Sequence, residues 1–138
     1  MAEPSSVYVF DTFAVIAHFE AESGGEKVKG LLNKAESGEI SLGMSSINMG
    51  ELAYVVSREQ GRDKARSMLE DLRSFPIRFY QATEERIIAA AWMKAEFPIS
   101  FADAFAASLA QELDAFLVTG DPEFKAIKHN LSLFWLGS

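Results

Sequence analysis

The chain has 138 residues, of which 49% are hydrophobic and 24% are charged, and its net charge is −7. It has no cysteine, which excludes disulfides, thiolate metal ligands and a cysteine nucleophile and fits a reducing compartment. Its longest apolar run, residues 87–93, is far shorter than the roughly 20 residues of a membrane-spanning helix, and residues 1–6 resemble no secretory signal. We therefore expect one cytoplasmic domain over residues 1–138, without membrane contact.

The first half of the chain is expected to alternate strands with helices. β-branched and aromatic runs indicate the strands, and apolar residues three or four positions apart indicate the helices. The expected elements are a strand at 7–10, helices at 12–23 and 26–37, a strand at 40–44, and helices at 47–60 and 62–75. Gly38, Gly61 and Pro76 stand where three of these helices end, and Ser45 or Ser46 can cap the helix at 47–60.

The second half continues the alternation. The expected elements are a strand at 77–81, helices at 84–97 and 101–113, a strand at 115–119, a short helix at 122–129 and a strand at 131–136. Thr83 and Ser100 are placed to cap two of these helices, and Pro122 suits the first position of the short helix.

Strands and helices that alternate through short connections imply parallel strands with helices on both faces of the sheet. We therefore expect an α/β fold, a three-layer α/β/α domain with a mostly parallel sheet of about five strands. Ligands of such sheets bind beyond the carboxyl ends of the strands, near the point where the strand order reverses. Asp11 and Asp121 each follow the end of an expected strand.

Three acids stand out by their positions beside expected strands and helices. Asp11 and Asp121 can each be explained as a cap of the helix that follows. Glu51 lies on the apolar stripe of its helix, where it needs a partner such as an arginine or a metal ion. Its neighbour Gly50 indicates either the close approach of another group or a tolerated defect, because glycine weakens a helix.

A fourth acid, Asp103, lies in a segment made almost wholly of Ala, Phe and Leu. Its neighbours three, four and seven positions on are Ala106, Ala107 and Ala110, which let the helix approach the sheet closely. A buried carboxylate without a partner costs several kcal/mol or takes up a proton, so we expect Asp103 to face a cation or a strong donor.

If the four acids converge on one crevice, divalent cations would remove their mutual repulsion. Oxygen ligands without cysteine or paired histidine favour Mg²⁺ or Mn²⁺ and argue against zinc. Two such ions can activate a water and stabilise the leaving oxygen of a phosphodiester, so no side-chain nucleophile is needed. Thr12 and Thr119, close to two of the acids, can hold waters or phosphate oxygens, whereas His18 and His129 lack ligand spacing and are expected to be structural.

The net charge of −7 weakens the expectation of a nucleic-acid partner, because phosphates are usually bound by a basic surface. It does not exclude one, since bound cations would offset part of the charge. The basic cluster Arg58, Arg62, Lys64 and Arg66 could meet RNA phosphates, although such a run is more often a solvated junction between helices.

Four segments, VFDTFAVIA, SSINMGELAYVV, SFADAFAASLAQ and LVTGDPEF, follow one another along the chain. In sequence and order they resemble the PIN-domain ribonucleases, especially the short VapC-type toxins of toxin–antitoxin pairs, over essentially the whole chain. The resemblance implies that the metal-binding, catalytic acids of the family fall on Asp11, Glu51, Asp103 and Asp121. It places Thr119 in the position of a supporting hydroxyl and Glu123 near a less regular extra acid.

The resemblance further implies Mg²⁺- or Mn²⁺-dependent cleavage of RNA, often of structured RNA such as tRNA, that leaves a 5′-phosphate. It also implies a homodimer and a VapB-type antitoxin whose C-terminal segment covers the active site. Gly120 departs from the family pattern, because a bulkier or polar residue is frequent there.

Other classes of protein remain as alternatives. The chain could be a non-catalytic PIN-like module that binds RNA or protein, or an RNA-processing nuclease outside a toxin–antitoxin pair. A phosphatase of the haloacid dehalogenase type is less favoured, since it needs a second Asp two residues after Asp11, where Phe13 stands. A receiver domain would need paired acids before the first helix and a late lysine, which are not evident.

Overall fold

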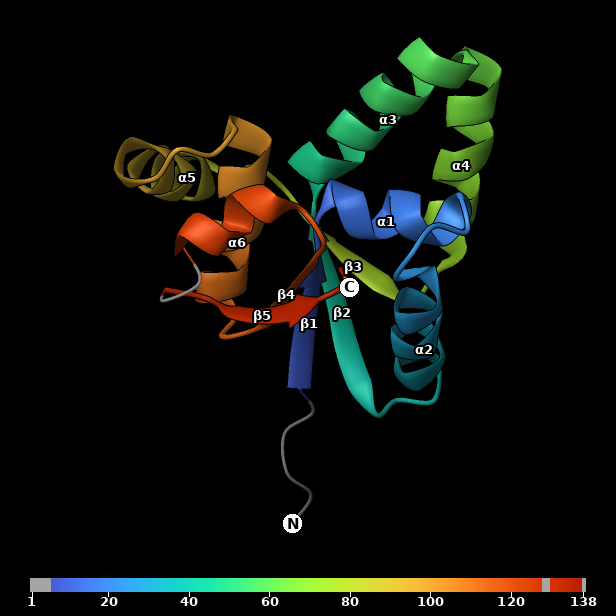
Figure 1. The fold of residues 1–138 in the computed structure, drawn as a ribbon, viewed down its shortest axis with the longest axis horizontal. Helices are drawn as coiled ribbons and strands as arrows, with labels where there is room; N and C mark the ends of the chain where they lie inside the picture. The colour runs from blue at the N-terminus through green and yellow to red at the C-terminus, as the bar shows by residue number, and fades with distance from the viewer. Residues whose placement is uncertain (1–5, 128–129, 138) are drawn as a thin grey trace.

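The computed structural model describes residues 6–127 and 130–137, which form an α/β fold around a five-stranded sheet (Figure 1). The strands are β1 (Ser6–Phe10), β2 (Ile40–Ser45), β3 (Ile77–Tyr80), β4 (Phe116–Thr119) and β5 (Ser132–Trp135). They lie in the order β3-β2-β1-β4-β5, and every pairing is parallel. The expected architecture is confirmed, and the sheet is wholly rather than mostly parallel.

Helices connect the strands, as the alternating pattern predicted. They are α1 (Thr12–Phe19), α2 (Gly25–Glu36), α3 (Ser46–Gln60), α4 (Arg62–Ser74), α5 (Glu84–Glu96) and α6 (Phe101–Glu112), with a 3-10 helix, η1 (Pro122–Ile127), before β5. The predicted caps are confirmed: the side chains of Ser45, Thr83 and Ser100 accept hydrogen bonds from backbone amides in the first turns of α3, α5 and α6. Each cap satisfies an amide that has no partner within its own helix.

Two helices differ from the expectation. The first ends at Phe19 instead of residue 23, and in the turn that follows Ala21 and Gly24 take positive φ angles of 51° and 91°. A Cβ on Gly24 would lie 2.8 Å from the Leu136 carbonyl oxygen, so packing against the end of the chain requires glycine in this turn. The helix expected at 122–129 is the 3-10 helix Pro122–Ile127, and residues 128–129 lie outside the described part.

The two faces of the sheet carry separate apolar clusters, because neighbouring strand residues point to opposite faces. Phe10 and Val118 pack with residues of α1, α2, α3 and α4 on one face. Val9 and Leu117 pack with residues of α5 and α6 on the other. In Figure 1 these two groups of helices lie to the right and left of the sheet, which gives the three expected layers. Within the described residues, no helix combines the length and apolarity needed to cross a bilayer.

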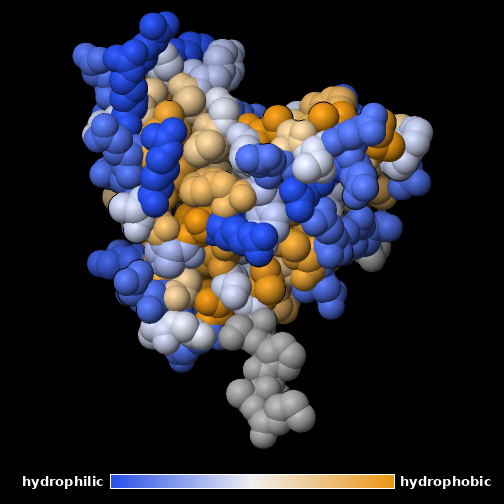
Figure 2. Space-filling view, turned by 180° about the vertical axis from the view of Figure 1, so that it is seen from behind, coloured by the Kyte–Doolittle hydropathy of each residue, from blue (hydrophilic) through white to orange (hydrophobic). Residues whose placement is uncertain are grey.

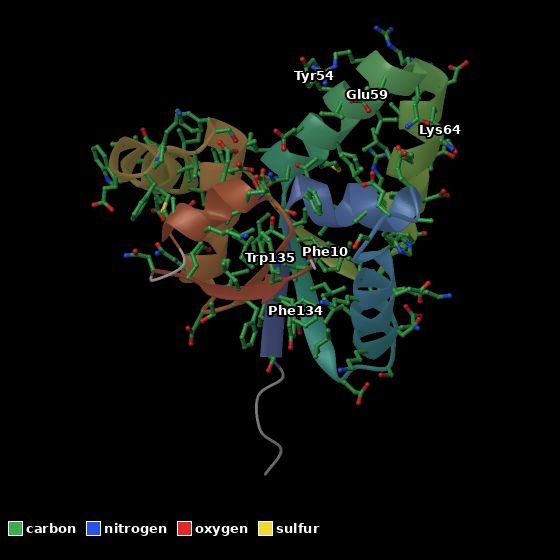
Figure 3. The ribbon with its side chains drawn as sticks, viewed as in Figure 1. Phe10, Tyr54, Glu59, Lys64, Phe134 and Trp135 are labelled. Atoms are coloured by element: carbon green, nitrogen blue, oxygen red, sulfur yellow. The ribbon has the colours of Figure 1, made fainter. Side chains whose placement is uncertain are left out.

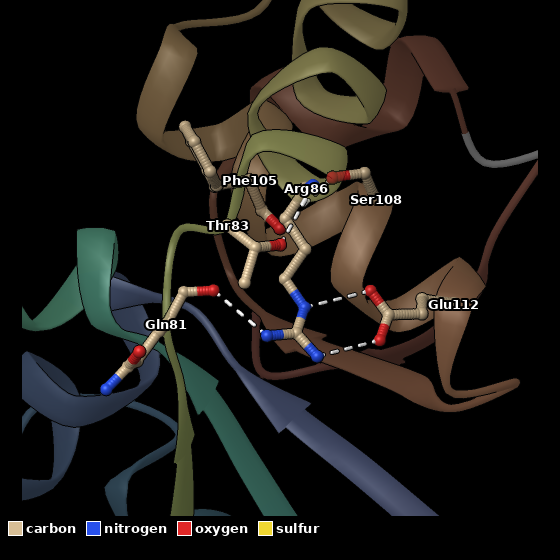
Figure 4. Close-up of polar contacts among 6 residues, drawn as sticks. All are labelled: Gln81, Thr83, Arg86, Phe105, Ser108 and Glu112. Atoms are coloured by element: carbon tan, nitrogen blue, oxygen red, sulfur yellow. Dashed lines mark hydrogen bonds and ion pairs between the residues drawn. The ribbon is translucent and has the colours of Figure 1, made fainter.

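Helix α6 packs closely on the sheet, and an ion pair joins α5 to α6. Ala106, Ala107 and Ala110 are all buried, as their small size predicted. Arg86 of α5 donates from Nε and Nη2 to the carboxylate of Glu112 at 3.1 and 3.0 Å (Figure 4). This paired contact joins the beginning of α5 to the end of α6, so the two helices run in opposite directions.

Helices α3 and α4 form a hairpin, and Figure 3 places Tyr54, Glu59 and Lys64 on it, away from Phe10 in the sheet. The basic cluster lies on this hairpin. Arg58 lies over the Tyr54 ring and pairs with Glu59 at 3.6 Å, and Arg66 approaches a carboxylate of α4 at 3.8 Å. Two of the four basic residues therefore have partners within the hairpin, which favours the explanation as a solvated junction.

Of the two histidines, His18 packs edge-on against the rings of Phe19 and Phe75. Burial lowers its pKa, and the charge of Lys29 lowers it further. This environment agrees with the structural role predicted for His18. His129 lies outside the described residues.

Candidate metal centre at the carboxyl edge of the sheet

The strand order reverses at β1, since β2 and β3 lie on one side of it and β4 and β5 on the other. In parallel sheets, ligand sites form beyond the carboxyl ends of the strands at such a point. Phe10 is paired with Val118, so Asp11 and the turn after Thr119 leave the sheet at the same edge. Asp121 lies in that turn, and the two acids therefore follow adjacent strands.

Both acids also cap the helices that follow them. Asp11 Oδ1 accepts a hydrogen bond from the Ala14 amide at 2.8 Å, and Asp121 Oδ1 accepts one from the Glu123 amide at 2.9 Å. The Asp121 amide donates to Thr119 Oγ1 at 3.0 Å. The capping explanation is thus correct for both residues. It accounts for one carboxylate oxygen of Asp121, whose second oxygen remains for another partner, whereas Asp11 also accepts from the Thr119 hydroxyl.

Three acids come together at this edge. Carboxylate oxygens of Asp103, Asp121 and Glu123 lie within 4.8 Å of one another. Asp103 is placed by the first turn of α6, where its amide donates to Ser100 Oγ at 3.1 Å. Its side chain is buried, that of Asp121 is partly buried and that of Glu123 is exposed, so the group extends from the interior to the surface.

Asp11 lies in the interior beside this group, with only 1% of its surface exposed. Burial raises its pKa to about 7. Hydrogen bonds from the Thr119 hydroxyl and the Ala14 amide lower the pKa but do not outweigh the effect of burial. The charges of Asp121 and Glu51 raise the pKa further. Asp11 is therefore within electrostatic reach of two of the other predicted acids.

Burial also raises the pKa of Asp103, to about 8. The nearby carboxyl group of Glu123 and the charges of Asp121 and Asp11 act in the same direction. Without a cation, at least one of these carboxyl groups holds a proton near neutral pH, because the fully ionised set would repel itself.

Glu51 is half-buried on α3, and its charge acts on Asp11 without its joining the group of three. No ion pair of Glu51 occurs in the described part of the chain, so the buried Glu–Arg pair is not observed. Gly50 is exposed, and among residues 6–127 and 130–137 nothing lies within 4 Å of the position of a Cβ there. The tolerated defect is therefore the better explanation for Gly50.

The chemistry of these residues fits a hard divalent cation. Asp11 and Asp103 are buried acids, and neither forms an ion pair with lysine or arginine anywhere in the described residues. The available donors are carboxylate and hydroxyl oxygens, which suit Mg²⁺ or Mn²⁺ better than a softer metal. Asp103, Asp121 and Glu123 could hold such an ion directly, with Asp11 and Glu51 beside them.

Asn48, a fully buried residue of α3, was not predicted as part of the site. Its Nδ2 donates to Thr12 Oγ1 at 3.3 Å and to the Ala102 carbonyl at 3.2 Å, and the Thr12 hydroxyl donates to the Asn48 carbonyl at 3.2 Å. Asn48 thus connects the residues that adjoin Asp11 and Asp103. Thr12 is buried and contributes to this link. The available signal was that Asn48 stands three positions before Glu51, on the same face of a helix.

Fold and site together define an α/β protein with clustered carboxylates at the switch point of a parallel sheet. Residues 8–130 match the PIN domain family, and the chain belongs to that family. PIN domains are typically metal-dependent nucleases. The resemblance inferred from four short segments is therefore confirmed. No curated relative matches the chain by sequence.

Solved structures share the fold over most of their length. A chain of VapBC2 from Rickettsia felis, bound to a DNA fragment from their promoter, has 25% identity and a TM-score of 0.71, with 93% of this chain and 97% of that one covered. VapBC-1 from nontypeable Haemophilus influenzae gives 24% identity, a TM-score of 0.67 and coverage of 94% and 98%. VapC20 from Mycobacterium tuberculosis, a sarcin-ricin loop cleaving toxin, has 18% identity and a TM-score of 0.68. The match covers 88% of this chain and 95% of that one.

Proposed function

We propose that this protein is a Mg²⁺- or Mn²⁺-dependent endoribonuclease that acts as the toxin of a VapBC-type toxin–antitoxin pair in the cytoplasm. One observation carries the proposal: Asp103, Asp121 and Glu123 converge at the carboxyl edge of the sheet, with buried Asp11 beside them. The structural similarity to VapC toxins supports the toxin role. The proposal takes residues 1–138 as a single nuclease domain.

In this proposal Asp11, Glu51, Asp103 and Asp121 hold the metal, and Glu123 supports them from the surface. The chemistry supplied by a bound divalent cation is the activation of a water and the stabilisation of charge on the phosphodiester. The chain itself orients the carboxylates, because they accept hydrogen bonds from backbone amides at helix starts and from a hydroxyl. Thr119 in particular donates to Asp11 and accepts from the amide of Asp121.

Water is the nucleophile in this scheme, so cleavage needs no serine or cysteine. The acids must be ionised to hold the metal, and buried Asp11 and Asp103 give up their protons when it binds. The substrate is RNA, with tRNA or another structured RNA as the first candidate, and the product carries a 5′-phosphate.

A homodimer and a VapB-type antitoxin complete the proposal. Structural neighbours were crystallised as VapBC complexes, which supports the antitoxin. Ile88 and Trp92 on α5 are 43% and 68% exposed. Figure 2 shows apolar residues on the side of the molecule that carries α5 and α6. Exposed apolar residues of this kind support association with a partner. Replacing Trp92 by Glu is expected to weaken a dimer formed there, and sedimentation at several protein concentrations would measure it.

The decisive experiment is the incubation of a total tRNA pool with purified protein in Mn²⁺, in Mg²⁺ and in EDTA, beside Asp11→Asn. Discrete cuts that need the metal and are absent with the variant are expected. Intact RNA in every lane, with RNA binding that survives Asp103→Ala, would support the non-catalytic module instead. Growth arrest that the neighbouring reading frame relieves would distinguish a toxin from an RNA-processing nuclease.

A further inference from the structure

Phe13 lies at the edge of the candidate metal centre, and the proposed function gives it no role. It stands in the first turn of α1, two residues after Asp11, and its ring lies against Gly120, the residue before Asp121. Ring atoms Cε1, Cζ and Cδ1 lie 2.5, 2.9 and 3.2 Å from the position that a Cβ on Gly120 would take. The ring is therefore seated on glycine backbone, between the turns that carry two of the acids.

With the ring in this position, a side chain at residue 120 would force the Phe13 ring to move. Any side chain there would occupy the space of the Phe13 ring, because real Cβ contacts are not as short as 2.5 Å. Gly120 has no positive φ angle, so close approach and not backbone conformation accounts for the glycine. Phe13 and Gly120 therefore form a matched pair.

Despite this close seat, 38% of Phe13 remains exposed. A large apolar ring that lies against backbone on one side and has a free surface suits a flat apolar ligand. Nucleobases stack on such rings in proteins that bind single-stranded nucleic acid. Stacking also binds RNA without positive charge, which matters for a chain whose net charge is −7.

We propose that Phe13 stacks on one unpaired nucleobase of the RNA, adjacent to the phosphodiester that is cut. This inference rests on the proposed ribonuclease function and adds a base-binding subsite to it. A base within a duplex is stacked on both faces, so the subsite requires a nucleotide in a loop, a bulge or a single strand. The protein would then select its cleavage position by RNA structure as well as by metal access.

The test uses an RNA oligonucleotide that spans a wild-type cleavage site, with KM and kcat measured in Mn²⁺. Phe13→Leu is expected to raise KM about 10-fold or more, and Phe13→Trp to restore most of the loss. An abasic nucleotide next to the cut should raise KM for the wild type and leave KM for Phe13→Leu unchanged. Mn²⁺ affinity, measured by electron paramagnetic resonance, should be the same in all three proteins.

Phe116→Leu is the matched control. Phe116 is 39% exposed, close to the value for Phe13, but it begins β4 at the opposite edge of the sheet and stacks on Tyr8. Its replacement should leave KM unchanged. Gly120→Ala alone should displace the Phe13 ring and raise KM. Added to Phe13→Leu, the same substitution should not raise KM further.

Several results would overturn the inference. Equal KM values for wild type and Phe13→Leu would exclude the stacking subsite while leaving the nuclease intact. Weaker Mn²⁺ binding by Phe13→Leu would show that the ring positions the acids, and a loss confined to binding of a protein partner would assign the ring to that partner. Absence of cleavage by the wild type would reject the proposed function and the subsite together.

Discussion

The helices α3 and α6 both bring an acid to the candidate centre, yet they are packed in opposite ways. Eight of the twelve residues of α6 are buried, so it is effectively a core helix. Only three of the fifteen residues of α3 are buried, and the others are partly buried or exposed. Asp103 on α6 consequently lies in surroundings that raise its pKa, whereas Glu51 on α3 is half-buried. Burial thus makes Asp103 more dependent on a cation than Glu51 is.

Asn48 is where the exposed helix is tied to the buried one. Its side-chain amide spans from α3 to the carbonyl of Ala102 in the first turn of α6. The direction of this amide is determined by its partners, since the carbonyl only accepts and the Thr12 hydroxyl already donates to the Asn48 backbone. Asn48 Oδ1 is consequently left buried without a partner among the residues described. The link orders the site at the expense of one unsatisfied oxygen.

The largest effect is expected from Asp103→Asn. RNA cleavage should fall more than about 100-fold, since removal of an outer-shell partner of a metal ligand alone costs 10–100-fold. The rise in melting temperature caused by Mn²⁺ should also disappear. The metal-free variant should be as stable as the wild type or more stable, because a buried acid becomes a neutral amide. Calorimetry in EDTA and in Mn²⁺ would measure both.

Asp114→Asn makes the same change at an exposed residue two positions beyond the opposite end of α6 and is the matched control. It should retain cleavage and the response to Mn²⁺. A large loss of stability in metal-free Asp103→Asn would instead assign Asp103 a structural role.

The second effect concerns the link between the helices. Asn48→Leu should weaken Mn²⁺ binding about 10–100-fold, as expected for a residue that orients metal ligands without touching the metal. The free energy of unfolding should change less than the free energy of Mn²⁺ binding. The Ala102 carbonyl keeps its helical hydrogen bond, and the unsatisfied Oδ1 of Asn48 is removed. Titration calorimetry would give the affinity.

Val56→Ala on the same helix is the control for Asn48→Leu. It should cost about 1–3 kcal/mol of stability through a cavity, with Mn²⁺ affinity unchanged. If the two variants bound Mn²⁺ equally well, Asn48 would not position the acids.

Adding side-chain volume should destabilise the protein more on α6 than on α3. Ala110→Leu adds volume between α6 and the sheet, where Ala110 is buried, and should destabilise by about 1–3 kcal/mol. Ala53→Leu on the less buried α3 should change the free energy of unfolding by about 0.5 kcal/mol or less. Urea denaturation in EDTA compares them, and equal losses would contradict the difference in packing.

The metal-free protein should lose stability as the pH rises. Asp11 and Asp103 have folded-state pKa values of about 7 and about 8, above the value of about 3.9 for an unfolded aspartate. Between these limits the folded state binds more protons, so the stabilisation is complete below about pH 4 and is lost as the pH rises through the folded pKa values. Melting temperatures in EDTA should therefore decrease from pH 5 to 8.5.

Asp103→Asn should flatten this dependence, because it removes the group with the higher pKa. Mn²⁺ should oppose the trend in the wild type, since metal binds the ionised carboxylates and its stabilising effect grows with pH. A melting temperature in EDTA that is independent of pH would contradict the raised pKa values.

The smallest effect is a gain on α3. Gly50→Ala should stabilise the protein by about 0.5–1 kcal/mol, because alanine is the better helix former and a methyl group at this exposed position meets nothing among the residues described. Urea denaturation measures the gain. A loss of stability would show that a methyl group is not accommodated.

Much of the fold followed from short-range patterns. The caps Ser45, Thr83 and Ser100 were identified correctly because a cap and its amide are two or three residues apart. The parallel sheet followed from the alternation of strands and helices. The end of the first helix was not found: the helix stops at Phe19, and the turn that follows includes Gly24, which packs against Leu136, more than a hundred residues away.

By itself, the sequence singled out four acids: Glu51 and Asp103 because each lies on an apolar helix face, and Asp11 and Asp121 because each follows an expected strand. The resemblance suggested Glu123 as an extra acid, but only the tertiary structure decided that its carboxylate meets those of Asp103 and Asp121 and that Asn48 connects α3 to α6. The physical reason is range. Propensity, periodicity and capping act within a few residues, whereas the partners of a buried carboxylate come from segments that meet only when the sheet has formed.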